Sequence, residues 1–134
     1  MLDRAPPDDV AVLIVDDQRF FRDAARDVIV ALPGFRAVAE AESGPEAVAA
    51  VDELLPDLVL LDVRMPGMDG IQTARKITGE HPDTVVVLVS AEDVAGLPSS
   101  AHRCGAAALV SKSEFGPSLL RDLWRRLGSS QRAG

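Results

Sequence analysis

A short apolar run that ends on one carboxylate constrains the fold of this chain more than any other feature. Residues 58–61 read Leu-Val-Leu-Leu, Asp62 follows, and Pro66 and Gly67 then break the chain. An exposed antiparallel strand would alternate polar and apolar residues, whereas a parallel strand covered on both faces is continuously apolar. The run therefore predicts a buried parallel strand with Asp62 at its carboxyl end. In open parallel sheets this end borders the functional crevice, although an aspartate there could also simply cap the following turn.

Strand-like and helix-like stretches alternate along the whole chain. Apolar runs predict strands at 10–15, 35–39, 58–61, 84–89 and 106–110, and helical spacing of apolar residues predicts helices at 21–32, 43–55, 70–77 and 119–127. This alternation favours an α/β fold with a parallel sheet. In the first helix the charged residues, among them Arg22, fall between the apolar positions, which is typical of a helix with one exposed face.

Local signals refine the helix boundaries. Ser43 and Glu46 fit a capping box at the start of the second helix, and Gly128 is expected to end the last one. Between residues 91 and 104, glycine and proline interrupt the pattern. We therefore expect local mobility there and at most a short helix at 99–104.

Composition limits the class of protein. The 134 residues suit one domain, with a disordered extension expected at 1–9, a folded unit at 10–128 and a flexible tail at 129–134. No apolar run approaches the roughly 20 residues that a membrane span needs, and the first residues do not resemble a secretory signal. A cytoplasmic location is therefore expected. The net charge of −7 disfavours direct binding to nucleic acid.

The cysteine and the two histidines are not expected to carry chemistry. Cys104 is the single cysteine, so it cannot form an internal disulfide, and we interpret it as a small core residue. His81 and His102 are interpreted as surface residues. The arginines near the C-terminus are interpreted as the solvated face of the last helix, with a partner surface as the alternative.

Polar residues follow four of the five predicted strands. They are Asp16 and Asp17, Asp62, Ser90, and Lys112. Small doubly wound sheets commonly take the order 2-1-3-4-5, which would bring the three carboxylates together at one crevice. Three close carboxylates repel one another unless a cation neutralises them, and an oxygen-only site suits Mg²⁺. Each residue alone could be an ordinary cap, loop or surface residue, but jointly they would suit a phosphoryl group on Asp62.

With these residues in view, the chain resembles the receiver domains of bacterial two-component response regulators over about 10–127. The resemblance implies a flavodoxin-like, doubly wound (βα)5 fold with a five-stranded parallel sheet, and the order 2-1-3-4-5 is itself taken from it. It implies that Asp62 accepts a phosphoryl group from a sensor histidine kinase or a phosphotransfer protein. It further implies Mg²⁺ held by Asp17, Asp16, Asp62 and the backbone carbonyl of Arg64.

In the same way, Ser90 and Lys112 are implied to contact the phosphoryl group. The chain also departs from the family pattern. Leu109 stands where an aromatic residue usually changes rotamer on activation. Ser113 follows the lysine in place of proline, so a trans peptide or a rearranged loop is expected there. Arg64 and Glu92 are expected to pair, and we hypothesise that the pair limits access of water to the acyl phosphate.

The leading interpretation is a phosphorylation-controlled switch that does not turn over an external substrate. Its output partner is expected on the face from the fourth strand to the last helix, and the protein is expected to be a monomer or a phosphorylation-dependent dimer. A stand-alone receiver is favoured over a fragment of a longer DNA-binding regulator. A haloacid-dehalogenase-like phosphatase would need an aspartate where Arg64 stands, and a flavodoxin-like nucleotide binder would need a glycine-rich phosphate loop.

Overall fold

Five parallel strands form one central sheet in the computed structural model, which describes residues 9–133 and the side chains of residues 9–127. The strands are β1 (Val10–Val15), β2 (Phe35–Ala41), β3 (Leu58–Asp62), β4 (Val85–Ser90) and β5 (Ala108–Ser111). Their order is β2-β1-β3-β4-β5, and every neighbouring pair is parallel. The expected α/β class and the expected strand order are both confirmed.

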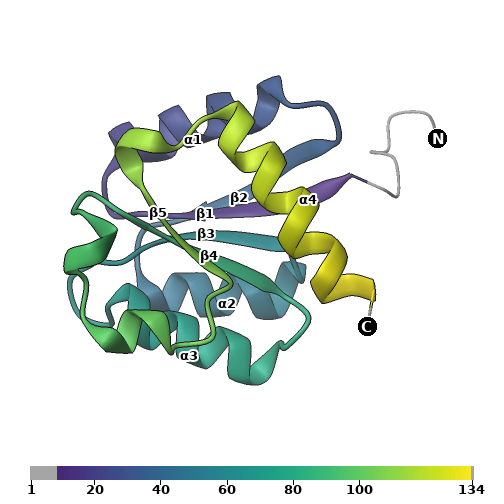
Figure 1. The fold of residues 1–134 in the computed structure, drawn as a ribbon. Coiled ribbons are helices and arrows are strands. Elements are labelled where there is room, and N and C mark those ends of the chain that lie inside the picture. The colour runs from purple at the N-terminus through teal and green to yellow at the C-terminus, as the bar shows by residue number, and fades with distance from the viewer. Residues whose placement is uncertain (1–8, 134) are drawn as a thin grey trace.

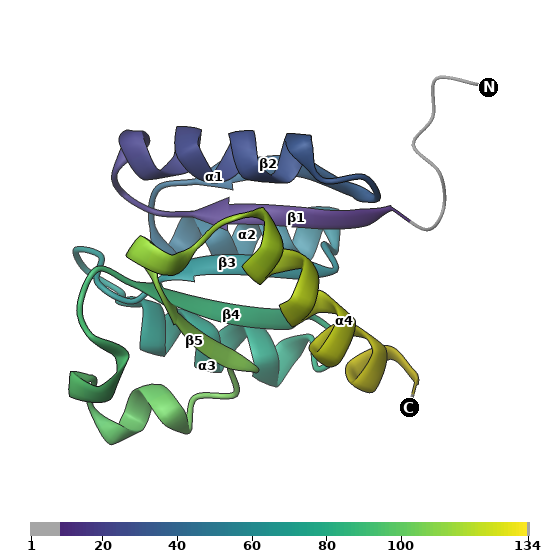
Figure 2. The ribbon, with the colours of Figure 1, turned by 45° about the horizontal axis from the view of Figure 1, so that its top comes forward.

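Four α-helices cover the two faces of the sheet. They are α1 (Arg19–Ala31), α2 (Gly44–Leu54), α3 (Gly70–Glu80) and α4 (Pro117–Ala133). Helices α1 and α4 lie on one face, and α2 and α3 lie on the other (Figure 1). The view in Figure 2 shows the sheet between these two layers.

The fourth crossover has no α-helix. Two short 3₁₀ turns, Val94–Gly96 and Ser99–His102, connect β4 to β5. This agrees with the interruption of the helical pattern by glycine and proline, and the (βα)5 pattern is complete in its strands but not in its helices. The mobility expected for this segment stays a prediction.

The expected stop at Gly128 is wrong, because α4 continues to Ala133. A glycine inside a helix costs only about 1 kcal/mol relative to alanine, so it does not end a helix whose other residues favour one. Residues 129–133 are therefore helical, and their expected flexibility stays a prediction. Of the expected N-terminal extension, residues 1–8 lie outside the described residues.

Consecutive residues of the strands feed two separate cores. Leu60 packs with the buried residues of α1 and α4, such as Ile29 and Leu120, whereas Leu61 packs with those of α2 and α3. Successive side chains in a strand point to opposite faces of the sheet. This explains why residues 58–61 are continuously apolar, and each such fully buried side chain contributes about 1.5–3 kcal/mol.

Side chains cap the N-termini of α2 and α3, the two helices on one face of the sheet. Ser43 Oγ accepts a hydrogen bond from the Glu46 N–H, as expected, but the Glu46 side chain accepts from the Glu42 N–H, so the box is only half formed. A complete capping box, which the sequence analysis missed, joins Asp69 and Gln72 at the start of α3. The cap thus fixes where α3 begins, eight residues after β3 ends.

Gly70 is required where α3 approaches the end of β3. A Cβ at this position would collide with the backbone of Asp62, and the Gly70 N–H donates to the Val63 carbonyl at 2.8 Å. Only a residue without a side chain allows this close approach. The contact holds the loop 63–69 above the carboxyl end of β3.

Candidate functional site

Three carboxylates meet at the carboxyl ends of the two central strands. Strands β1 and β3 pair in register up to Val15 and Leu61, so Asp16 and Asp62 follow at the same level. One oxygen of each of these carboxylates, and one of Asp17, all lie within 4.8 Å of one another. Asp16 and Asp62 are 0% and 5% exposed, whereas Asp17 faces solvent. The structure therefore brings together the three aspartates that the sequence singled out.

The lysine that follows β5 reaches the same crevice. Lys112 begins a 3₁₀ turn directly after β5, and the side chain of Ser111 caps this turn. The Lys112 Nζ lies 2.7 Å from Asp16 Oδ2 and 3.7 Å from Asp62 Oδ1. One ammonium thus pairs with two of the three clustered carboxylates, which leaves an excess of negative charge.

Burial and this excess of negative charge both weaken the acidity of Asp62. Burial and the neighbouring Asp16 carboxylate raise the pKa of Asp62 from 3.8 to about 6, and Asp17 adds to the rise. The Lys112 ammonium and the backbone N–H of Arg64 lower the same pKa but do not compensate. A carboxylate that is buried among like charges gains from any additional cation.

The oxygens of the cluster fit a hard divalent cation. Asp16 Oδ2 is buried and accepts no aligned hydrogen bond within the described part of the chain, although the Lys112 ammonium lies beside it. Mg²⁺ prefers carboxylate and carbonyl oxygens and keeps several waters, as a half-open crevice allows. The residues present therefore suit Mg²⁺.

Ser90 ends the strand next to β3. The pairing of Asp62 with Val89 puts Ser90 one residue beyond the level of Asp62. Ser90 is 1% exposed, and its Oγ accepts a hydrogen bond from the Glu92 N–H at 2.9 Å. A hydroxyl that accepts from the backbone keeps its own proton to donate.

Comparison with known proteins identifies this arrangement. Residues 12–124 match the family model described as the response regulator receiver domain. The chain belongs to this family. Neither of the two rival families that the sequence left open is the one that matches.

Two bacterial signalling proteins are similar over about three quarters of this chain. CheY of Listeria monocytogenes is 41% identical over 101 residues, which is 75% of this chain and 84% of that protein. The response regulator GacA of Pseudomonas viridiflava is 36% identical over 103 residues, which is 77% of this chain but 48% of that protein. The chain therefore spans about half the length of the GacA proteins that it matches.

Solved receiver structures have the same fold. The receiver domain of the putative regulator NarL from Mycobacterium tuberculosis has a TM-score of 0.81 at 32% identity, and the match covers 90% of this chain and 99% of that one. The complex of CheX and CheY with BeF3 and Mg from Borrelia burgdorferi matches with a TM-score of 0.77 at 28% identity, covering 87% of both chains. Receiver domains are signalling modules that bind Mg²⁺, and the acidic cluster for it is present here.

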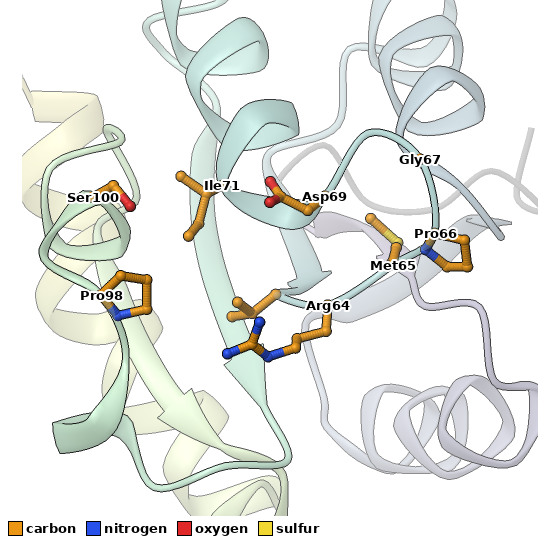
Figure 3. A pocket seen from close by; sticks show the side chains of 9 residues that line it. Arg64, Met65, Pro66, Gly67, Asp69, Ile71, Pro98 and Ser100 are labelled. Atoms are coloured by element: carbon orange, nitrogen blue, oxygen red, sulfur yellow. The ribbon is translucent and has the colours of Figure 1, made fainter.

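Two residues expected at the rim of this receiver's crevice are paired. Arg64 Nε donates to Glu92 Oε1 at 2.9 Å, and Arg64 Nη2 lies 2.9 Å from the same oxygen. The pairing is confirmed, and it joins the loop after β3 to the loop after β4. Arg64 also lines an open pocket of about 600 Å³, with Pro98 and Ser100 on its far side (Figure 3).

The departures from the family pattern also have a place in the structure. Leu109 lies in β5, pairs with Leu88 and packs against the core under α2 and α3. The peptide bond between Lys112 and Ser113 is trans, as expected. Cys104 is 2% exposed and is thus confirmed as a core residue.

The two histidines lie apart from this crevice. His102 is exposed, whereas His81 is half-buried and its Nε2 lies 2.7 Å from Asp52 Oδ1.

Among the described residues no helix has both the length and the apolar character that a membrane crossing requires.

Sequence reasoning missed two residues of α1 that support the site. Arg22 was assigned to the exposed face, but it is 8% exposed, and its Nη1 donates to the Asp16 carbonyl at 2.8 Å. Its Nε donates to Glu40 Oε1 at 3.1 Å, so the charge is neutralised. Phe21 is one of the apolar residues whose spacing predicts this helix; it packs against the core, and the Lys112 ammonium lies over its ring. The alternation of charge and apolarity in α1 gives no signal for either contact.

Proposed function

We propose that Asp62 accepts a phosphoryl group from a phosphohistidine of a sensor histidine kinase or of a phosphotransfer protein, and that the phosphorylated domain controls an output partner. The observation that carries this proposal is the buried Asp62 carboxylate, which lies with Asp16 and Asp17 in one cluster and faces the Lys112 ammonium at 3.7 Å. The site thus offers a nucleophile and a nearby positive charge together.

Transfer needs only one bond to form and one to break. An oxygen of Asp62 bonds to phosphorus as the bond from phosphorus to the donor imidazole breaks, and the electron pair returns to the imidazole nitrogen. The Lys112 ammonium stabilises the added negative charge, and the Ser90 hydroxyl donates a hydrogen bond to a phosphoryl oxygen. Mg²⁺, held by Asp17, Asp16, Asp62 and the backbone carbonyl of Arg64, would neutralise the phosphoryl oxygens.

The charge added at Asp62 would reach the surface through Ser90. Because Ser90 Oγ accepts from the Glu92 N–H, a movement of Ser90 toward the phosphoryl group pulls on the loop that follows β4. That loop leads into the 3₁₀ turns and β5. The output surface is therefore expected on β4, β5 and α4, where a partner or a second copy would bind.

The Arg64–Glu92 pair would set the lifetime of the phosphoryl group. Both side chains are more than half exposed, and together they cross the opening between the loops after β3 and β4. A paired guanidinium over the crevice would restrict the approach of water to phosphorus. Arg64→Ala is expected to speed dephosphorylation several-fold, and an unchanged rate of loss would contradict this role.

The cellular setting of the receiver is predicted from the sequence and not from the geometry of the site. A cytoplasmic location, a stand-alone receiver and the absence of external turnover stay predictions. The alternative, a receiver within a longer DNA-binding regulator, is kept as well, since the GacA proteins match over about half of their length.

The deciding experiment is the intact mass of the protein after incubation with acetyl phosphate, with and without Mg²⁺. The wild type is expected to gain one phosphoryl group only with Mg²⁺, and Asp62→Asn is expected to gain none. Asp83→Asn, an exposed aspartate before β4, is the matched control and should behave as the wild type. If Asp62→Asn gains phosphate as the wild type does, Asp62 is not the acceptor.

A further inference from the structure

The Lys112 ammonium has three close neighbours, and one of them is not a carboxylate. Its Nζ lies 2.7 Å from Asp16 Oδ2, 3.7 Å from Asp62 Oδ1 and 4.7 Å from the centroid of the Phe21 ring. The distance to the ring is within the ~6 Å over which an ammonium is attracted to an aromatic face. The side chain of Lys112 is 15% exposed, so water screens this attraction only in part.

The Phe21 ring is itself held in place. Phe21 packs against the core under α1 and α4, and its centroid lies 5.9 Å from that of Phe115 with the two rings tilted by 57°. Tilted rings at such a distance attract each other. At the next residue, the side chain of Arg22 connects α1 to the end of β1, because its Nη1 donates to the Asp16 carbonyl. The ring thus keeps one face toward the crevice.

The lysine gains from such a support. Its stem is flexible, and holding it in one conformation costs up to about 2 kcal/mol of side-chain entropy. Ser113 follows it, and the backbone is held by a single 3₁₀ turn. The two carboxylates compete for the ammonium, and a strong bond to Asp16 alone would draw it away from Asp62. An aromatic face attracts the charge without taking a directed N–H bond, so it leaves the N–H groups free to reach both acids.

We propose that Phe21 is a positioning residue for Lys112, and that its ring face keeps the ammonium within reach of the phosphoryl group on Asp62. The proposal rests on the proposed function of the site. It assigns no contact between Phe21 and the phosphoryl group. It predicts that the aromatic face of residue 21, and not only its volume, governs the rate of phosphoryl uptake.

The first experiment compares the same substitution at two neighbouring phenylalanines. Phe21→Leu is expected to lower the initial rate of uptake from acetyl phosphate about three- to ten-fold, which corresponds to ~0.7–1.4 kcal/mol of lost cation–π attraction. Phe20 is 87% exposed, so Phe20→Leu is the control and should keep the wild-type rate. Phe21→Trp should restore most of the rate. Equal rates for Phe21→Leu and the wild type would overturn the proposal.

The second experiment separates the ring face from packing. Graded fluorination of the Phe21 ring withdraws electron density from its face and changes its size little. The uptake rate is expected to fall stepwise with each added fluorine, while the midpoint of thermal unfolding of a Lys112→Met background stays constant over the series. A flat series of rates would overturn the proposal even if Phe21→Leu fails to fold.

The double variant identifies which idea fails if one does. In the Lys112→Met background, Phe21→Leu should cause no further loss of uptake and a smaller change in the unfolding equilibrium constant than in the wild type. If Lys112→Met itself takes up phosphate at the wild-type rate, the proposed role of Lys112 fails. If Lys112→Met loses uptake and Phe21→Leu does not, only the positioning role fails.

Discussion

The two aspartates at the ends of β3 carry the same side chain and have opposite surroundings. Asp57, just before the strand, accepts a hydrogen bond from the Ala11 N–H at 2.9 Å, and its backbone bonds to Ala11 and Val85 on the neighbouring strands. Asp62, at the other end, lies among two more carboxylates, and its pKa is raised to about 6.

The difference is one of stability: Asp57 stabilises the fold, whereas ionised Asp62 destabilises the metal-free fold. Asp57 joins β1, β3 and β4 at the amino end of the sheet. Asp62 is buried where more negative charge already lies than Lys112 can balance. A site of this kind is available for a cation and for chemistry, because any group that supplies positive charge is bound with a gain in free energy.

The largest expected effect concerns phosphoryl uptake. Asp62→Asn is expected to abolish it, since an amide oxygen is a poor nucleophile, whereas Asp57→Asn should take up phosphate as the wild type does. Intact-protein mass after treatment with acetyl phosphate and Mg²⁺ measures both variants. Loss of uptake in both would mean that the two ends of β3 are not functionally separate.

The second effect is on the free energy of unfolding. Asp62→Asn is expected to raise it, whereas a substitution that removes a contact ordinarily lowers it. In the metal-free protein above pH 6, Asp62 is ionised in the folded state although its pKa is about two units above its ordinary value, which costs about 3 kcal/mol. Asp62→Asn removes this cost and should stabilise the metal-free protein at pH 7.

The pH dependence of that gain provides the control. Since the folded-state pKa is the higher one, folded Asp62 becomes protonated as the pH falls from about 6 toward 3.8, and the wild type recovers the lost stability. The gain from Asp62→Asn should therefore shrink to nearly zero at pH 4. Urea unfolding at pH 7 and pH 4 measures this gain in the free energy of unfolding. A gain that does not depend on pH would falsify the conclusion that ionised Asp62 destabilises the fold.

Mg²⁺ should stabilise the wild type by neutralising the same cluster of carboxylates. A ligand that binds only the folded state at 100 times its dissociation constant stabilises it by about 2.7 kcal/mol. We expect this stabilisation for the wild type in thermal unfolding at pH 7 and a much smaller one for Asp17→Asn. NaCl at the same ionic strength serves as the control for simple screening of charge, and an equal shift for Asp17→Asn would place the ion elsewhere.

The sequence predicted the strand ends because their signal is local. An apolar run that stops at a polar residue marks a strand end wherever the chain places it, so Asp16, Asp62, Ser90 and Lys112 were all found. That Asp57 and Asp62 differ in role could be inferred only from the polar residues at the carboxyl ends of the other strands. The approach of those groups to Asp62, and its raised pKa, depend on the assembled sheet.

The sequence failed where tertiary partners or small energies decide. Arg22 belongs by periodicity to the exposed face of α1, but the Asp16 carbonyl and Glu40 satisfy it in a buried position. The contact between Phe21 and Lys112 joins residues that are distant in the chain. Gly128 did not end α4, because its cost of about 1 kcal/mol is smaller than what the rest of the helix supplies.

The smallest expected effect is the loss of stability on substitution of Asp57. Its carboxylate accepts from a backbone N–H, and such a charge-assisted bond contributes about 1.5–3 kcal/mol when fully buried. Asp57 is only half-buried, so Asp57→Asn, which keeps an oxygen acceptor, should destabilise the protein by about 1 kcal/mol at pH 7.

Urea unfolding of Asp57→Asn and Asp57→Ala at pH 7, with and without Mg²⁺, measures this cost. Because Asp57 lies at the end of the sheet away from the crevice, the loss should be the same in both conditions, whereas the gain from Asp62→Asn should appear only without Mg²⁺. A loss at Asp57 that depends on Mg²⁺ would show that the two ends of β3 are energetically coupled. Independence would mean that the destabilisation by ionised Asp62 is confined to the crevice, where a phosphoryl group and its counter-ions can relieve it.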